Sequence, residues 1–126
     1  MKQIEEVMDG FGRQMGFEQF CLNSEGISCL EIEGMGTLFL EKSDDVFLLS
    51  LSREVPSFQR NVFMWALESC HYQEGHPFPV HAGLVSENLL VFSARVPAAE
   101  LSVPMLDRLT DLLFQMQRNV DREEGP

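Results

Sequence analysis

The sequence has little positive charge and no long apolar run. It carries 9 Lys and Arg residues against 20 Asp and Glu residues, for a formal net charge of −11. That balance argues against non-specific binding to nucleic acid and against docking on an anionic membrane surface, because both depend on basic residues. No stretch approaches the length of a transmembrane helix, so we expect no stable membrane insertion.

Cysteine is scarce as well. Cys21, Cys29 and Cys70 are an odd number without the spacing of a disulfide framework, which favours a reducing compartment over a secreted scaffold. The N-terminal segment has acidic residues where a signal peptide needs an apolar run. These observations predict a cytoplasmic protein.

Motifs that mark catalysis or cofactor binding are missing. The chain contains no G-x-S-x-G motif, no P-loop and no G-x-G-x-x-G motif after a strand. One grouping hints at a metal site, but its spacing is not that of a zinc finger: Cys70, His71, His76 and His81. We therefore expect no enzymatic activity, no catalytic residues, no cofactor and no metal.

What the chain does contain is a regular succession of apolar segments. Their periodicities predict the element order αβββαββα: a helix over 2–15, strands over 27–32, 37–41 and 46–51, a helix over 57–72, strands over 81–85 and 89–94, and a helix over 102–120. The short links between strands favour antiparallel pairing. With 126 residues, the chain is expected to form one α+β domain over 1–120, with 121–126 as a flexible tail.

Two of these elements carry an unusual feature. In the first helix, Gly10 and Gly12 cost about 1 kcal/mol each relative to Ala, so packing must hold the helix. In the second strand, Phe39 opposes Leu38 and Leu40, which makes the sheet apolar on parts of both faces. One face would cover the core, and the other could receive a partner.

The helix expected over 57–72 is apolar around about half of its circumference or more. A helix that covers a single sheet needs an apolar stripe of about 100°. The excess predicts a subunit interface on this helix. The alternative is that the last helix or a loop of the same chain covers the extra face.

The chain also resembles a known family. Its element order, small size and acidity are similar to those of the class I chaperones of bacterial type III secretion, the Tir-chaperone (CesT/SycE-like) family. Three stretches are similar to the SycN-like branch: Gly-Thr-Leu-Phe-Leu-Glu at 36–41, Gly-Leu-Val-Ser-Glu-Asn-Leu-Leu-Val-Phe at 83–92 and Leu-Ser-Val-Pro-Met-Leu at 101–106.

The resemblance implies a chaperone that binds a non-globular segment near the N-terminus of a secreted effector or gatekeeper protein and keeps it secretion-competent without ATP. It implies either a homodimer or a heterodimer with a second small chaperone. The cargo-binding residues that it implies are Ile4, Met8, Phe11, Met15, Leu38 and Leu40. The dimer-interface residues that it implies are Phe58, Val62, Trp65 and Ala66.

Two other functions compete with this interpretation, since a fold does not by itself determine a function. One is a generic dimeric adaptor or assembly domain. The other is a small hot-dog-like thioesterase, which would need a polar catalytic residue on the helix that faces the dimer. That helix offers Glu68 and Ser69, but no convincing acid or nucleophile in an apolar cleft.

Overall fold

The computed structural model describes residues 2–17, 20–54, 80–86 and 88–124. Within these residues the elements are α1 (Lys2–Gln14), β1 (Ile27–Ile32), β2 (Gly36–Ser43), β3 (Val46–Glu54), β4 (Val80–Ser86), β5 (Leu89–Pro97), a 3-10 turn (Ala98–Glu100) and α3 (Val103–Glu124). The α+β class and the order of these elements are confirmed. The helix predicted over 57–72, with Phe58, Val62, Trp65 and Ala66, lies outside the described residues.

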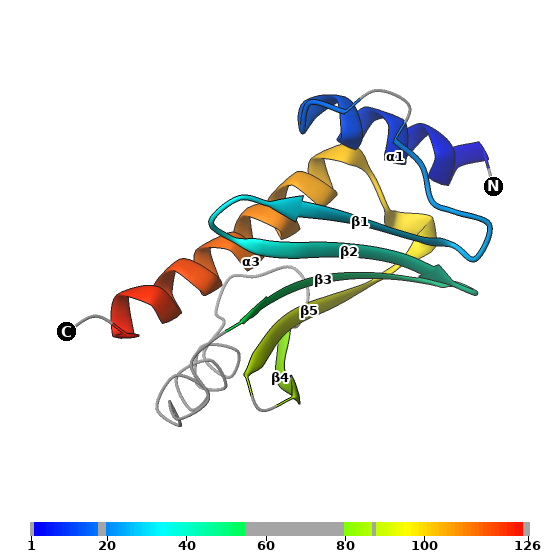
Figure 1. Cartoon of the computed structure of the whole chain (residues 1–126). Coiled ribbons are helices and arrows are strands. Elements are labelled where there is room, and N and C mark those ends of the chain that lie inside the picture. The colour runs from blue at the N-terminus through cyan, green and yellow to red at the C-terminus, as the bar shows by residue number, and fades with distance from the viewer. Residues whose placement is uncertain (1, 18–19, 55–79, 87, 125–126) are drawn as a thin grey trace.

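The five strands form one antiparallel sheet in the order β1-β2-β3-β5-β4. Short turns join β1 to β2 and β2 to β3, as the sequence predicts. β3 pairs with β5 rather than with β4, so β1 and β4 are the two edges of the sheet. Figure 1 shows α3 running across one face of the sheet, with α1 beside the N-terminal part of α3.

The core lies between the two helices and this face of the sheet. It is built by the alternation of the strands: in β2, Leu38 and Leu40 are buried, and Phe39 between them is exposed. The same period continues in β3 and β5, whose buried apolar positions are Phe47, Leu49, Leu51, Leu90, Phe92, Ala94 and Val96. One sheet face is therefore committed to the core, and the large side chain of Phe39 belongs to the other.

Ser102 begins the last helix. Its hydroxyl accepts a hydrogen bond from the Met105 backbone N–H at 3.2 Å, which satisfies one of the free donors of the first turn. The helix continues past the predicted end at residue 120 to Glu124. The flexibility of the tail predicted over 121–126 stays a prediction.

Candidate functional site

Five of the six residues predicted to bind cargo are in the core. The exposed fraction is 4% for Ile4 and 0% for Met8, Phe11, Leu38 and Leu40. Met15 is partly buried and packs against the same cluster. The structure thus brings all six together, but five of them present almost no surface to a partner in this conformation. Their role in binding cargo stays a prediction.

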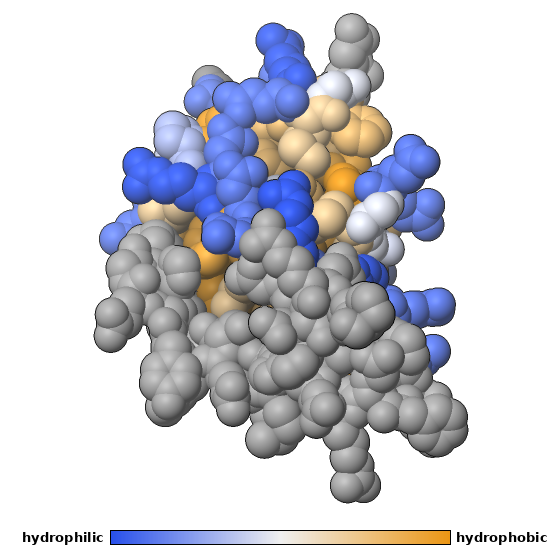
Figure 2. Space-filling view, turned by 90° about the vertical axis from the view of Figure 1, so that its left-hand side faces the viewer, coloured by the Kyte–Doolittle hydropathy of each residue, from blue (hydrophilic) through white to orange (hydrophobic). Residues whose placement is uncertain are grey.

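Other apolar side chains do reach the surface. Phe39 is 40% exposed on the sheet face opposite the helices, and Phe17 is 42% exposed just after α1. Further exposed apolar residues are Val46, Leu84 and Val85. Figure 2 shows apolar residues gathered among hydrophilic ones over the described part of one side of the molecule. Surface of this kind is typical of proteins that bind other proteins.

Among the described residues, no strand pairs with the outer edge of β1, the side that faces away from β2. The Asn23 N–H donates to the Ile27 carbonyl at 2.8 Å, on the side of β1 that faces away from β2. Because backbone groups alternate between the two sides of an antiparallel strand, the N–H and C=O of Cys29 and Glu31 point to this same outer side. Within the described residues, no further backbone hydrogen bond reaches them there. This edge can pair with an added strand.

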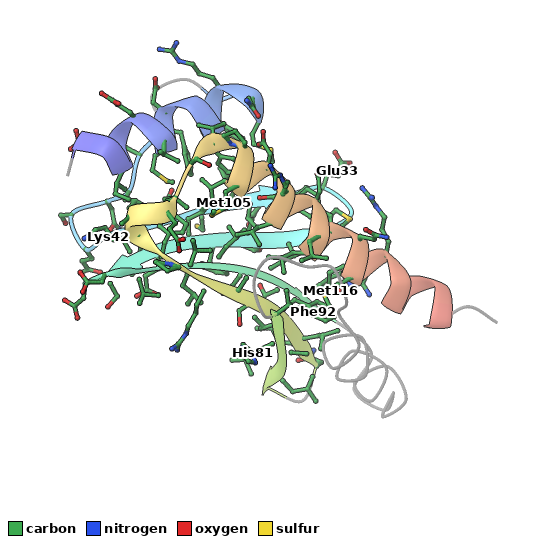
Figure 3. The ribbon with its side chains drawn as sticks, turned by 180° about the vertical axis from the view of Figure 1, so that it is seen from behind. Glu33, Lys42, His81, Phe92, Met105 and Met116 are labelled. Atoms are coloured by element: carbon green, nitrogen blue, oxygen red, sulfur yellow. The ribbon has the colours of Figure 1, made fainter. Side chains whose placement is uncertain are left out.

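A pocket of about 560 Å³ lies close to the start of β1, between the N-terminal half of α1 and the segment that leads into the strand. We call it the α1 pocket. Ile4 and Met8 contribute apolar wall from α1, and Phe20 and Leu22 contribute it from the connecting segment. Lys42, near the end of β2, lines the opposite side; Figure 3 shows it below α1. Two of the predicted cargo-binding residues, Ile4 and Met8, thus line a pocket.

Sequence patterns did not point to Phe20 and Leu22. They lie in a segment without helical or strand periodicity, so neither belongs to a predicted apolar face. The signal that could have found them is the presence of large apolar residues at Phe17, Phe20 and Leu22 in a connecting segment. The Phe20 ring centroid lies 6.4 Å from that of Phe11 and 6.5 Å from that of Phe17.

One polar contact joins the two described helices. With the Gln14 amide oriented so that its nitrogen faces the carboxylate, Nε2 donates to Oδ1 of Asp107 at 2.9 Å, which links the end of α1 to α3. Burial raises the pKa of the Asp107 carboxyl above its usual range, and the nearby Asp111 carboxylate raises it further. The described residues contain no group of three His, Cys, Asp or Glu side chains placed to hold a metal ion. Cys70, His71 and His76 lie outside them.

The family model described as "Type III secretory system chaperone SycN" matches residues 3–121. The chain belongs to this family. SycN-type proteins are chaperones and not enzymes, which removes the thioesterase alternative. The match spans α1 to α3 and agrees with the resemblance that the three sequence stretches indicated. None of the described helices is both long and apolar enough to cross a membrane.

Individual relatives agree with this assignment. The chain is 28% identical over 121 residues to "Chaperone protein SycN" of Yersinia enterocolitica, covering 95% of this chain and 98% of that one. Two solved structures share the fold. The Yersinia pestis type III secretion chaperone SycH, solved with a fragment of YscM2, has a TM-score of 0.72 at 11% identity and covers 93% of this chain and 98% of that one. The Pseudomonas aeruginosa ExoU–SpcU complex has a TM-score of 0.63 at 21% identity and covers 90% and 93%.

Proposed function

We propose that this chain is a cytoplasmic chaperone of type III secretion that binds a non-globular segment near the N-terminus of a secreted effector or gatekeeper protein. The observation that carries the proposal is the family match over residues 3–121. Solved structures with a similar fold include such pairs, among them the HopA1–SchA chaperone–effector complex. The segment is held extended and secretion-competent, and no ATP is consumed.

The physical basis of binding is the free edge of β1 beside apolar surface. An extended segment can add a strand at Cys29–Glu31, where the backbone supplies hydrogen bonds with little demand on sequence. Apolar side chains of the segment then supply affinity, at about 25 cal/mol per Å² of buried apolar area. Segments that fold on binding bury roughly 1,000–3,000 Å² of surface. The free energy gained from this burial exceeds the cost of ordering the segment.

The six predicted cargo-binding residues divide into two roles in this proposal. Ile4 and Met8 belong to the apolar wall of the α1 pocket, but they are only 4% and 0% exposed, so a cargo side chain reaches them only when α1 shifts. The remaining four, Phe11, Met15, Leu38 and Leu40, hold α1 against the sheet and so keep the binding surface in shape.

Dimerisation is part of the proposal as well. We assign the interface to Phe58, Val62, Trp65 and Ala66, on the evidence of the broad apolar arc in the sequence. The working unit is a homodimer or a heterodimer with a second small chaperone. Val62→Asp and Trp65→Asp should convert the assembly to monomers or aggregates, because an unpaired charge in a buried interface is costly. If light scattering shows that the wild-type protein is a monomer, both alone and with its partners, the proposed interface is contradicted.

The cargo is tested by purifying the tagged chain from its native cell without added nucleotide and identifying bound proteins by mass spectrometry. We expect a secreted protein whose N-terminal region is protected from protease by the chaperone, while its folded domains are cleaved as in the free protein. A partner that binds through a folded domain would instead favour the adaptor interpretation. Complete loss of the complex on depletion of ATP would contradict the ATP-independent mechanism.

A further inference from the structure

Phe39 lies between two small side chains on the sheet face opposite the core. The register pairs it with Cys29 of β1 on one side and with Ser50 of β3 on the other. Paired residues direct their side chains to the same face of a sheet, so both neighbours lie beside Phe39. Phe39 is 40% exposed, and Cys29 is exposed as well. Because Cys29 is small, a long side chain that arrives from the outer edge of β1 has room to reach the Phe39 ring.

Two carboxylates flank this ring. Glu41 lies two residues after Phe39 in β2, so its side chain points to the same face. Glu31 of β1 pairs with Thr37, which lies two residues before Phe39, so Glu31 belongs to this face as well, on the other side of the ring. We call Cys29, Glu31, Phe39 and Glu41 together the Phe39 site.

The negative charge of the Phe39 site is not compensated within the described part of the chain. Glu31 is exposed, Glu41 is partly exposed, and neither forms an ion pair there. Arg95 of β5 lies on the same face, but Leu48 pairs with both Arg95 and Glu41 and separates them by one strand. In a protein of net charge −11, an exposed aromatic ring between two such carboxylates favours a cationic group over a neutral or anionic one.

The outer edge of β1 supplies the direction of approach. A segment that pairs with this edge as an added strand places one of its residues opposite Cys29, with the side chain on the face that carries Phe39. Neighbouring strands are about 4.8 Å apart, so the backbone of that residue lies roughly 10 Å from the backbone of Phe39. A long side chain spans this gap by lying over Cys29, whereas a short one does not reach the ring.

We propose that a strand added at the outer edge of β1 carries an Arg opposite Cys29, and that its guanidinium lies on the ring of Phe39. Glu31 and Glu41 hold the guanidinium from the two sides. This inference rests on the proposed function and names a residue type in the bound segment. Arg fits better than Lys, because its planar guanidinium stacks on an aromatic face and donates hydrogen bonds to carboxylates in a fixed geometry. Backbone pairing alone makes little demand on sequence, so the Phe39 site selects among the segments that can pair with β1.

The test uses short Thr-rich peptides, uncharged except at one central position, titrated into the ¹⁵N-labelled full chain and followed by NMR. The central residue is Arg, Lys, Ala or Glu. We expect the largest shift changes at the backbone amides of Cys29, Glu31 and Phe39. Replacing Arg by Ala should weaken binding about threefold to tenfold, as for a cation–π contact combined with partly exposed ion pairs. The Lys peptide should bind with an affinity between those of the Arg and Ala peptides, and the Glu peptide should bind more weakly than the Ala peptide.

Matched variants of the protein separate the Phe39 site from the overall charge. Phe39→Leu keeps an apolar side chain without an aromatic face, and should remove the preference for Arg over Lys while the Ala peptide binds as before. Glu41→Gln should reduce the preference for Arg over Ala. Glu33→Gln, at an exposed position in the turn after β1, makes the same change in net charge and should leave that preference unchanged.

The reactivity of two thiols gives an independent measurement. Cys21 and Cys29 are both exposed, so iodoacetamide should alkylate both in the free protein. An Arg side chain that lies over Cys29 covers its thiol and leaves that of Cys21, in the segment before β1, uncovered. We therefore expect the Arg peptide to slow the alkylation of Cys29 severalfold and to leave that of Cys21 unchanged. The Ala peptide should protect Cys29 less at the same concentration. Tandem mass spectrometry assigns the label to each cysteine.

The outcomes are distinct. Equal binding of the Arg and Ala peptides, no binding of either, or a preference for Arg over Lys that survives Phe39→Leu would overturn the inference. Equal effects of Glu41→Gln and Glu33→Gln, or protection of Cys21 in place of Cys29, would overturn it as well. If a secreted protein co-purifies equally with the wild type and with the folded Phe39→Leu and Glu41→Gln variants, the Phe39 site takes no part in holding it and the proposed function stands. If no secreted protein co-purifies with the wild type while the peptides bind as expected, the proposed function fails and the preference of the β1 edge for Arg stands.

Discussion

Phe20 packs its Cβ directly against the backbone of Gly12, so a methyl group at position 12 would occupy the same space as Phe20. This contact explains a glycine within the last turn of α1, which helix propensity alone disfavours by about 1 kcal/mol. It also joins α1 to the segment that walls the α1 pocket. The neighbouring Gly10 is explained in the same way, since a Cβ there would lie 2.9 Å from Cγ2 of Val103 in α3.

Gly12→Ala should therefore destabilise the protein, although Ala is the better helix former. We expect a loss of about 1–3 kcal/mol in the free energy of unfolding, the usual cost of forcing extra atoms into a packed site. Gly10→Ala should cost less, because its nearest neighbour is a side-chain methyl group rather than an atom next to the backbone. Urea denaturation followed by circular dichroism measures both. An increase in stability for Gly12→Ala would show that Phe20 does not pack there.

The local patterns of the sequence were sufficient to predict most of the described fold. Alternation in β2 predicts that Leu38 and Leu40 share one face and that Phe39 takes the other, because successive strand residues point to opposite faces. Helical spacing likewise predicts the buried face of α1. These features depend on neighbours in the chain, so the sequence displays them directly.

The location of the binding surface could not be predicted in the same way. Periodicity identifies Ile4, Met8 and Phe11 as one apolar face, but it does not say whether a partner or the protein's own core covers that face. In the structure the protein's own core covers this face, because Ile4, Met8 and Phe11 are buried in the same cluster as residues of α3 and the sheet. The α1 pocket depends on contacts between segments far apart in sequence, such as α1, Leu22 and Lys42, which no local pattern records.

The stability of the protein should depend on the protonation of Asp107. Its pKa is raised in the folded state above 3.8, so the folded protein binds this proton more tightly than the unfolded chain. The contribution of Asp107 to the free energy of unfolding therefore becomes more favourable as the pH falls through the folded pKa. It becomes less favourable as the pH rises through that value. Asp107→Asn keeps an acceptor for Gln14 and removes the repulsion from Asp111.

We accordingly expect Asp107→Asn to be as stable as the wild type at neutral pH or more stable, with a gain under about 1 kcal/mol because the group is partly exposed and screened. Below the folded pKa the advantage should vanish. Thermal melts between about pH 3 and pH 7, a range that brackets the titration of a carboxyl group, measure the difference in stability between Asp107→Asn and the wild type. Asp111→Asn is the control, since it removes the same repulsion and leaves the contact to Gln14 intact. A large loss of stability for Asp107→Asn at neutral pH would mean that the charged carboxylate is needed.

Gln117 should be replaceable by an apolar residue with a gain in stability. It is 0% exposed on α3, and neither its Oε1 nor its Nε2 has a hydrogen-bond partner in the described structure. A buried polar group left unpaired costs about 1–3 kcal/mol, and Met has a similar shape without that cost. Gln117→Met should therefore raise the free energy of unfolding by about 1 kcal/mol or more. Gln115→Met, an exposed position on the same helix, should change it by less than about 0.5 kcal/mol. Destabilisation by Gln117→Met would point to a buried water that pairs with the amide.

Leu40 and Phe39 provide a direct test of which apolar residues face a partner. They are adjacent in β2, but Leu40 is 0% exposed and Phe39 is 40% exposed on the opposite face. Leu40→Asp places an unpaired charge in the core, which costs several kcal/mol, and should unfold the protein. Met8→Asp should do the same, since Met8 is also 0% exposed. Phe39→Asp should leave the circular dichroism spectrum intact, because its carboxylate stays in water. If Leu40→Asp and Met8→Asp instead fold normally and lose only the bound cargo, these side chains turn outward in solution, and the groove predicted from the sequence is the binding site itself.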